Sequence, residues 1–284
     1  FWKSLGSPKK FNLIELGAGN GEMMKDLIDT FQNFPVFLNS CNIVIHEKSP
    51  FLVNIQKKKL IDTKITWVSK ISKLGNNPSI FIANEFFDSI AIRQFRKKKN
   101  LWFEKFVNLK EKDNIFFFEK KISIKKIEKN LNFNISRGQT FIEYSELGFN
   151  YLKEISKIIK KNTGGLLLID YGYTEKKMKN TLKAVSNHKI ANILNDKGSV
   201  DITHNINFTL FKRFVEKMGG LKNNITSQRN FLLRMGIQQR AEIISKNLDF
   251  SKKADIYFRF KRLTDENQMG NLFKVMLIKN QKNK

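Results

Sequence analysis

Apolar and polar residues alternate along the chain in short blocks, separated by glycines or polar stretches. Residues 11–16 form an apolar run that predicts a buried strand. Gly17, Gly19 and Gly21 predict a tight turn, and residues 22–31 follow as a helix with one apolar face. Further strands are predicted at residues 41–46, 65–68, 79–83, 166–170 and 272–278. This order of strands and helices predicts a doubly wound α/β sheet.

The pattern changes after residue 91. From residue 92 to residue 121 aromatic residues alternate with charged ones, which predicts a small antiparallel β insertion with the aromatic residues as its core. Helices are predicted at residues 50–60, 147–161, 208–218 and 239–248, and a long polar loop at 174–205. We therefore expect a first part of the core (1–91), a β-rich insertion (92–140) and a second part of the core with helical additions (141–284).

The formal net charge of +26 normally indicates a nucleic-acid partner. Only nine of the 52 basic residues are arginines, and the lysines are spread over almost every predicted helix. Lys, Asn, Ile and Phe share A/T-rich codons, so the base composition of the genome is sufficient to explain the charge. We therefore interpret the basic residues as a solvated surface rather than as a nucleic-acid site, with a functional polyanion site as the alternative.

Cysteine, histidine and hydropathy exclude several other classes of protein. Cys41 is the only cysteine, which excludes disulfide frameworks and thiolate metal clusters and fits a reducing compartment. His46, His188 and His204 show no ligand spacing, so we expect no metal site. No apolar run reaches the roughly 18–20 residues that a membrane span needs.

The glycine turn distinguishes between cofactors. A dinucleotide fingerprint, G-x-G-x-x-G, would need glycine at position 22, where Glu22 would repel a pyrophosphate. The observed spacing is Glu15-x-Gly17-x-Gly19-x-Gly21. It resembles motif I of class I S-adenosylmethionine-dependent methyltransferases, whose cofactor lacks phosphate and carries a positive sulfonium and ammonium. The alternative is a glycine turn that binds no ligand.

Polar side chains follow two of the predicted strands, at the edge where doubly wound sheets bind ligands. Glu47 follows the strand at residues 41–46, where an acidic residue accepts hydrogen bonds from both ribose hydroxyls. Asn84, Glu85 and Asp88 follow the strand at 79–83 and are our candidate catalytic residues. Capping of the next helix is the alternative role for the two carboxylates.

Three further residues are candidates for binding a substrate. Asp170 ends the predicted strand at residues 166–170, and Asp201 and Thr203 lie in the long polar loop. Turn or helix capping is the alternative role for all three.

Several motifs, in order along the chain, carry a resemblance to one family. They are residues 15–21, 84–88 with 93–95, 169–173, 181–184 with His188, 201–203 with Phe208, 226–240 and 269–275. With these motifs the chain resembles the MidA-type class I S-adenosylmethionine-dependent methyltransferases, which include a mitochondrial complex I assembly factor that methylates an arginine. The resemblance implies the Rossmann-like class I methyltransferase fold and an N-terminal segment that this chain, which starts at Phe1, is expected to lack. Family members tend to have Asp at the position of Asn207, which weakens a catalytic role there.

The resemblance implies S-adenosyl-L-methionine as cofactor and a protein arginine as acceptor, such as one in a subunit of respiratory complex I, with a role in assembly of that complex. We assign Glu85 to binding the guanidinium in a bidentate fork, with Asp88 as second carboxylate and Asn84 as an acceptor near the reacting centre. Glu15 and the three glycines would hold the cofactor and Glu47 its ribose.

Two other functions remain open on the sequence. One is a nucleic-acid methyltransferase, indicated by the charge, and the other is a non-enzymatic assembly factor that keeps the fold. We expect a cytoplasmic location for a bacterial source, which the A/T-rich composition favours, and the mitochondrial matrix for a eukaryotic one. The sequence leaves the oligomeric state open.

Overall fold

The computed structural model describes residues 1–61, 63–110, 114–186, 189–194 and 200–281, so His188 lies outside the described residues. The chain divides into two compact units. The first contains Phe1–Phe86, Leu152–Asp170 and Val215–Lys284, and the second contains Phe87–Tyr151 and Tyr171–Phe214.

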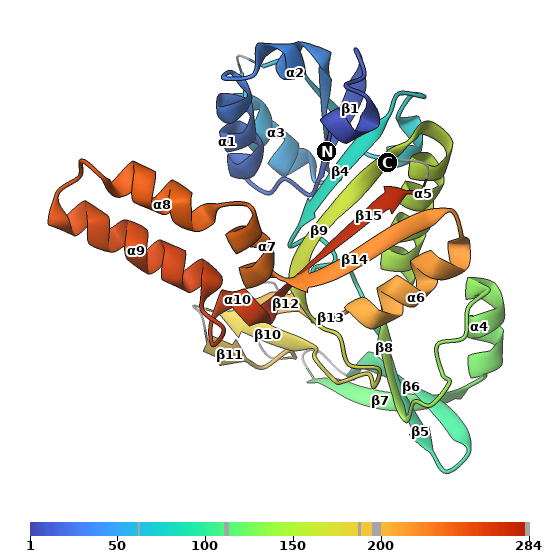
Figure 1. Ribbon diagram of the computed structural model, residues 1–284. Coiled ribbons are helices and arrows are strands. Elements are labelled where there is room, and N and C mark those ends of the chain that lie inside the picture. Colours follow the sequence, from blue (N-terminus) through green and yellow to red (C-terminus); the bar gives the residue numbers. More distant parts are fainter. Residues whose placement is uncertain (62, 111–113, 187–188, 195–199, 282–284) are drawn as a thin grey trace. The chain divides into compact units, whose positions relative to one another are not determined.

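A seven-strand path in the order β14-β15-β9-β4-β1-β2-β3 forms the sheet of the first unit (Figure 1). Strands β1, β2, β3, β4 and β9 pair in parallel, whereas β14 is antiparallel to β15. The chain proceeds outward from β1 to β2 and β3, then returns to pair β4 on the other side of β1. This reversal makes the point between β1 and β4 the expected ligand position of a doubly wound sheet. The bounds are β1 (Phe11–Leu16), β2 (Cys41–His46), β3 (Ile65–Val68), β4 (Ser79–Asn84), β9 (Gly164–Tyr173), β14 (Leu221–Ser227) and β15 (Phe273–Asn280).

The helix after β1 is held by an apolar cluster. Met24 and Ile28 of α1 pack with Ile43 and Ile45 of β2 and with Leu60. Burial of these side chains fixes the helix that begins directly after Gly21. The helices of this unit are α1 (Glu22–Phe31), α2 (Pro35–Ser40), α3 (Pro50–Lys59), α7 (Gln228–Arg234), α8 (Ile237–Ser245), α9 (Phe250–Thr264) and α10 (Met269–Leu272), with short 3-10 helices at Lys3–Leu5 and Ile71–Lys73. Strand β9 and the helices α5 (Glu146–Asn162) and α6 (Phe208–Met218) each have residues in both units.

The second unit contains two antiparallel sheets. One has the order β7-β6-β5-β8 and the other the order β11-β10-β12. Short β13 (Ile206–Asn207) pairs in parallel with Gly172 and Tyr173 of β9. The remaining bounds are β5 (Arg93–Lys98), β6 (Leu101–Lys110), β7 (Asn114–Ile122), α4 (Ile124–Leu131), β8 (Phe141–Tyr144), β10 (Lys183–Ser186), β11 (Lys189–Ala191) and β12 (Asp201–Thr203).

The structure confirms the predicted fold class, an α/β protein with a doubly wound sheet, an antiparallel β insertion and helical additions. It differs at residues 174–205, where β10, β11 and β12 occupy parts of the expected loop. Among the described residues, no helix has the length and apolar character that crossing a membrane requires. These residues also contain no group of three or more metal-ligating side chains.

Candidate functional site

The turn between β1 and α1 places three glycines in left-handed backbone conformations. Gly17, Gly19 and Gly21 have φ angles of 66°, 52° and 80°. A Cβ atom at Gly17 would lie 2.8 Å from Cδ2 of Phe86, whereas a Cβ atom at Gly19 would have no atom within 4 Å. The backbone at Gly19 therefore faces open space, and a ligand can approach it there.

Glu15 is a buried carboxylate in β1, the strand that precedes this turn. The side chain is only 3% exposed, and burial raises its pKa to about 7. Its Oε2 atom accepts no hydrogen bond from the described residues. A buried carboxylate oxygen without a donor is unfavourable, so this atom suits a ligand that brings an N–H donor or a positive charge.

Glu47 is held in place at the end of β2. Its Oε1 accepts hydrogen bonds from the backbone N–H groups of Lys48 (2.8 Å) and Ser49 (2.9 Å). Its Oε2 accepts one from Nε2 of Gln56 at 3.2 Å. A carboxylate has about four acceptor positions, so Glu47 can still accept from a ligand hydroxyl.

Gln56 joins the glycine turn to the ends of two strands, and the sequence analysis did not identify it. Its Nε2 also donates to the carbonyl of Gly19 (2.8 Å), and its Oε1 accepts from Nε1 of Trp67 (2.9 Å). The side chain is fully buried in α3. The sequence does contain a signal for Gln56, because it lies on the same helical face as Leu52 and Leu60. A polar residue on an apolar face needs buried hydrogen-bond partners.

The chain bends sharply after β4. Glu85 adopts a φ of +47°, which is uncommon for a residue with a side chain, and its N–H donates to the carbonyl of Ile169 at 3.0 Å. Nδ2 of Asn84 donates to Oε1 of Glu85 at 3.4 Å. The bend places Phe86 against Gly17 and leaves the Glu85 side chain exposed. Such a backbone conformation costs about 1–3 kcal/mol and is found often at active sites.

Asp88 lies in the second unit, where the structure brings it together with Thr203. Oγ1 of Thr203 donates to Oδ2 of Asp88 at 2.8 Å, and the N–H of His204 donates to its backbone carbonyl at 3.3 Å. Asp88 is 7% exposed, and burial raises the pKa of its carboxyl group. The hydrogen bond from Thr203 opposes this shift because it stabilises the charged form.

The two remaining candidates, Asp170 and Asp201, differ in exposure. Asp170 is fully buried near the end of β9 in the first unit. Asp201 is exposed at the start of β12 in the second unit, where it pairs with Val185. Asn207 caps α6, since its Oδ1 accepts from the N–H of Leu210 at 2.9 Å. The roles of the candidate residues remain predictions.

A family model described as "Putative S-adenosyl-L-methionine-dependent methyltransferase" matches residues 1–226. The chain belongs to this family. The matched part includes the glycine turn and the bend after β4. The predicted class of enzyme, an S-adenosylmethionine-dependent methyltransferase, and the predicted cofactor are thereby confirmed.

Two curated relatives of this methyltransferase illustrate the similarity. The chain is 28% identical over 310 residues to protein arginine methyltransferase NDUFAF7, mitochondrial, from Xenopus laevis, covering 96% of the chain and 68% of the relative. It is 24% identical over 312 residues to the protein of the same name from Homo sapiens, covering 96% of the chain and 67% of that relative.

Two solved structures from Burkholderia thailandensis share the fold of this methyltransferase. One, of an uncharacterized protein, has a TM-score of 0.81 at 20% identity and covers 98% of this chain and 76% of that one. The other, bound to S-adenosyl-homocysteine, has a TM-score of 0.77 at 20% identity and covers 98% of this chain and 73% of that one.

The residues of the first unit fit the cofactor of this family. Oε2 of Glu15 is buried without a donor, and S-adenosylmethionine carries an ammonium group that can donate. The backbone at Gly19 is open to a ligand, and Glu47 keeps acceptor capacity for the ribose hydroxyls. When bound, the cofactor supplies an electrophilic methyl group on a positive sulfur atom.

Proposed function

We propose that this methyltransferase acts on a nitrogen atom of an arginine side chain in a protein. The observation that carries the proposal is the bend after β4, which presents the carboxylate of Glu85 to solvent beside the amide of Asn84. The name of the vertebrate relatives, protein arginine methyltransferase, supports the same acceptor.

A carboxylate at this position can make an arginine nitrogen a better acceptor for a methyl group. The guanidinium group stays protonated, and delocalisation of its lone pairs makes it a poor nucleophile. A bidentate contact with Glu85 would orient one nitrogen and localise the positive charge on the others. Asn84 would accept a hydrogen bond near the reacting nitrogen. Because methyl transfer needs an in-line approach at about 3 Å, such positioning supplies much of the rate.

The other candidates receive supporting roles in the proposal. Glu15 would bind the amino-acid end of the cofactor and Glu47 its ribose, while the three glycines would admit it to the backbone. Asp88, held by Thr203, would act as the second carboxylate. Asp201 and Thr203 would contribute to binding the acceptor protein, and the fully buried Asp170 would support the end of β9 beneath the site.

The acceptor and the compartment follow from the family resemblance. We propose a subunit of respiratory complex I as acceptor, with methylation serving the assembly of that complex. The two vertebrate relatives are named as mitochondrial proteins. The mitochondrial matrix is accordingly the proposal for a eukaryotic source, and the cytoplasm is the proposal for a bacterial one.

Substitution of Glu85 tests the mechanism. The chain would be incubated with tritiated S-adenosylmethionine and an extract of cells that lack it, and cofactor binding would be measured by isothermal titration. We expect Glu85→Gln to reduce protein labelling by at least about 100-fold while the cofactor affinity stays within about twofold. The matched control Asp26→Asn removes an exposed carboxylate from α1 and should leave both quantities unchanged.

Each alternative function has a distinct outcome in the same assay. Retained turnover in Glu85→Gln removes this residue from the mechanism. Label that enters RNA rather than protein replaces the proposal with a nucleic-acid methyltransferase. Cofactor binding without transfer to any acceptor identifies a non-enzymatic assembly factor.

A further inference from the structure

A pocket in the second unit lies on one face of the sheet β7-β6-β5-β8 and has a volume of about 380 Å³. Register places Arg96 opposite Phe103, and Lys105 opposite Glu119, so side chains of β5, β6 and β7 share this face. The opposite face carries the buried Phe95 and Trp102. The expectation that the aromatic residues form the core of the insertion therefore holds for one face and not for the other.

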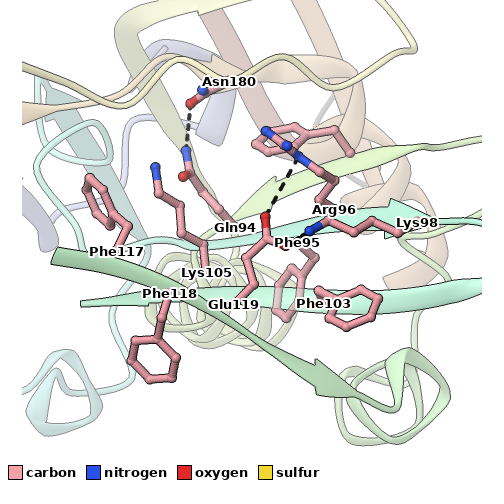
Figure 2. Close-up of a pocket in the computed structure, with 11 residues that line it drawn as sticks. Gln94, Phe95, Arg96, Lys98, Phe103, Lys105, Phe117, Phe118, Glu119 and Asn180 are labelled. Carbon is pink, nitrogen blue, oxygen red and sulfur yellow. Dashed lines mark hydrogen bonds and ion pairs between the residues drawn. The ribbon is translucent and has the colours of Figure 1, made fainter. Parts of the chain in front are cut away.

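The charges in the pocket are paired unevenly. Glu119 lies 2.5 Å from Nζ of Lys98 and 3.9 Å from Nε of Arg96. Glu119, which lies directly opposite Lys105 on the neighbouring strand, is therefore already paired with Lys98 and Arg96. Figure 2 shows both ion pairs beside Phe103.

Lys105 is left with an aromatic ring as its contact. Its Nζ lies 3.7 Å from the centroid of the Phe117 ring, and among the described residues no carboxylate is within ion-pair distance of it. In Figure 2 the side chain points into the pocket between Phe117 and Gln94. Burial and the nearby Arg96 lower the pKa of this lysine, while the charges of Glu119 and Glu143 oppose that effect only in part. An anion placed beside Lys105 would stabilise the charged form of this lysine and so offset the effects of burial and of Arg96.

The amide of Gln94 is fixed at the same position. Its Nε2 donates to Glu143 at 2.6 Å and to Asn180 at 2.8 Å, and the side chain is 5% exposed. The wall of the pocket around the lysine is therefore preorganised, and Phe103 and Phe117 provide apolar surface next to it. A preorganised site loses less conformational entropy when a ligand binds.

We propose that this pocket binds an acidic side chain, together with a neighbouring apolar side chain, from an extended segment of the acceptor protein. The inference rests on the proposed function in taking the acceptor to be a protein. A lysine that has no carboxylate partner among the described residues, framed by phenylalanines, matches a single carboxylate next to an apolar group. A nucleic-acid backbone would require a row of such cations. In an extended segment, residues two apart share a face, so the pattern expected is apolar-x-acidic-x-apolar.

Peptide binding tests the proposal on the full chain without using activity. The probes are the fluorescein-labelled peptides Gly-Leu-Ser-Glu-Ser-Leu-Gly and its Glu-to-Gln counterpart, and anisotropy is recorded near physiological salt to screen unspecific attraction by the basic chain. We expect the Glu peptide to bind about tenfold more tightly than the Gln peptide. Lys105→Met should abolish this preference and Lys105→Arg should restore most of it.

Lys97→Met is the matched control, because Lys97 is an exposed lysine of β5 on the opposite face. Circular dichroism verifies that each variant is folded. Equal binding of both peptides, or equal loss in the Lys97 and Lys105 variants, overturns the proposal. Tighter binding of an oligothymidylate that also depends on Lys105 overturns it in favour of nucleic acid. Cofactor binding is titrated separately, so a failure of the methyltransferase proposal is distinguishable from a failure of this pocket.

Discussion

The buried carboxylate of Glu15, a candidate cofactor-binding group, lowers the stability of the folded chain when it is ionised. Burial raises the pKa of its carboxyl group from 4.5 to about 7. The folded chain therefore holds this proton more tightly than the unfolded chain does. The contribution of Glu15 to stability is fully present below about pH 4.5 and is lost as the pH rises through about 7.

Glu15→Gln should accordingly stabilise the chain in the absence of cofactor. We expect the free energy of unfolding at pH 8 to rise on the order of 2 kcal/mol, with little difference from the parent chain at pH 4.5. Urea unfolding at the two pH values measures both effects. A variant that is less stable at pH 8 would contradict the role of burial.

The same substitution should weaken cofactor binding. Only the ionised carboxylate attracts an ammonium group, so affinity for S-adenosylmethionine should rise between about pH 5.5 and about pH 7 in the parent chain, where the ligand amine stays protonated, and change little in Glu15→Gln. Titration calorimetry at three pH values checks this. An equal pH dependence in both proteins would place the titrating group elsewhere.

Gln56 shows which part of the site the sequence did not reveal. The acidic and glycine positions were found because their spacing is characteristic of a sheet edge that binds a ligand. Gln56 acts through contacts with Gly19, Glu47 and Trp67, which lie 37, 9 and 11 positions from it in the sequence. Its position on the helical face of Leu52 and Leu60 indicates that Gln56 needs buried partners, but only the fold shows which partners these are.

The turn between β1 and α1 provides a test of the glycine spacing. Gly19→Ala adds one methyl group in open space at a φ of +52°, so the strain should reduce stability by about 1–2 kcal/mol without preventing folding. The methyl group would still hold the cofactor away from the backbone. We expect at least a tenfold loss of affinity for S-adenosylmethionine in titration calorimetry.

Gly6→Ala is the matched control for this change. Gly6 has a φ of +82° and equally open space, but it lies outside the turn. It should reduce stability by a similar amount and leave cofactor affinity unchanged. If both variants lose affinity equally, backbone strain rather than the position in the turn explains the effect.

Elements with one clear apolar period were predictable, and elements whose order depends on distant partners were not. The predicted strands at residues 11–16, 41–46 and 65–68 coincide with β1, β2 and β3. Strand β14 was not expected, because its polar sequence carries little alternation and its order comes from backbone pairing with β15. Helix α9 was also missed, since Phe250 and Phe258 are 86% and 64% exposed and obscure a single apolar face.

The net charge of +26 on the whole chain bears on how an acceptor reaches it, and not on how the cofactor binds. Lysines dominate this charge, and exposed lysines attract an acidic protein over distances that salt screens. The cofactor is small and carries no net negative charge, so it gains nothing from this field.

Salt should therefore separate the two binding events. Raising sodium chloride from about 50 to about 300 mM shortens the screening length, so KM for the protein acceptor should increase several-fold while kcat is maintained. The dissociation constant of S-adenosylmethionine should change by less than about twofold. Steady-state kinetics and calorimetry on the same samples give both values. An equal loss of affinity for cofactor and acceptor would show that salt acts on the fold of the chain. A KM that does not change with salt concentration would show that the acceptor binds through an uncharged surface. The basic residues would then only keep the surface of the chain solvated.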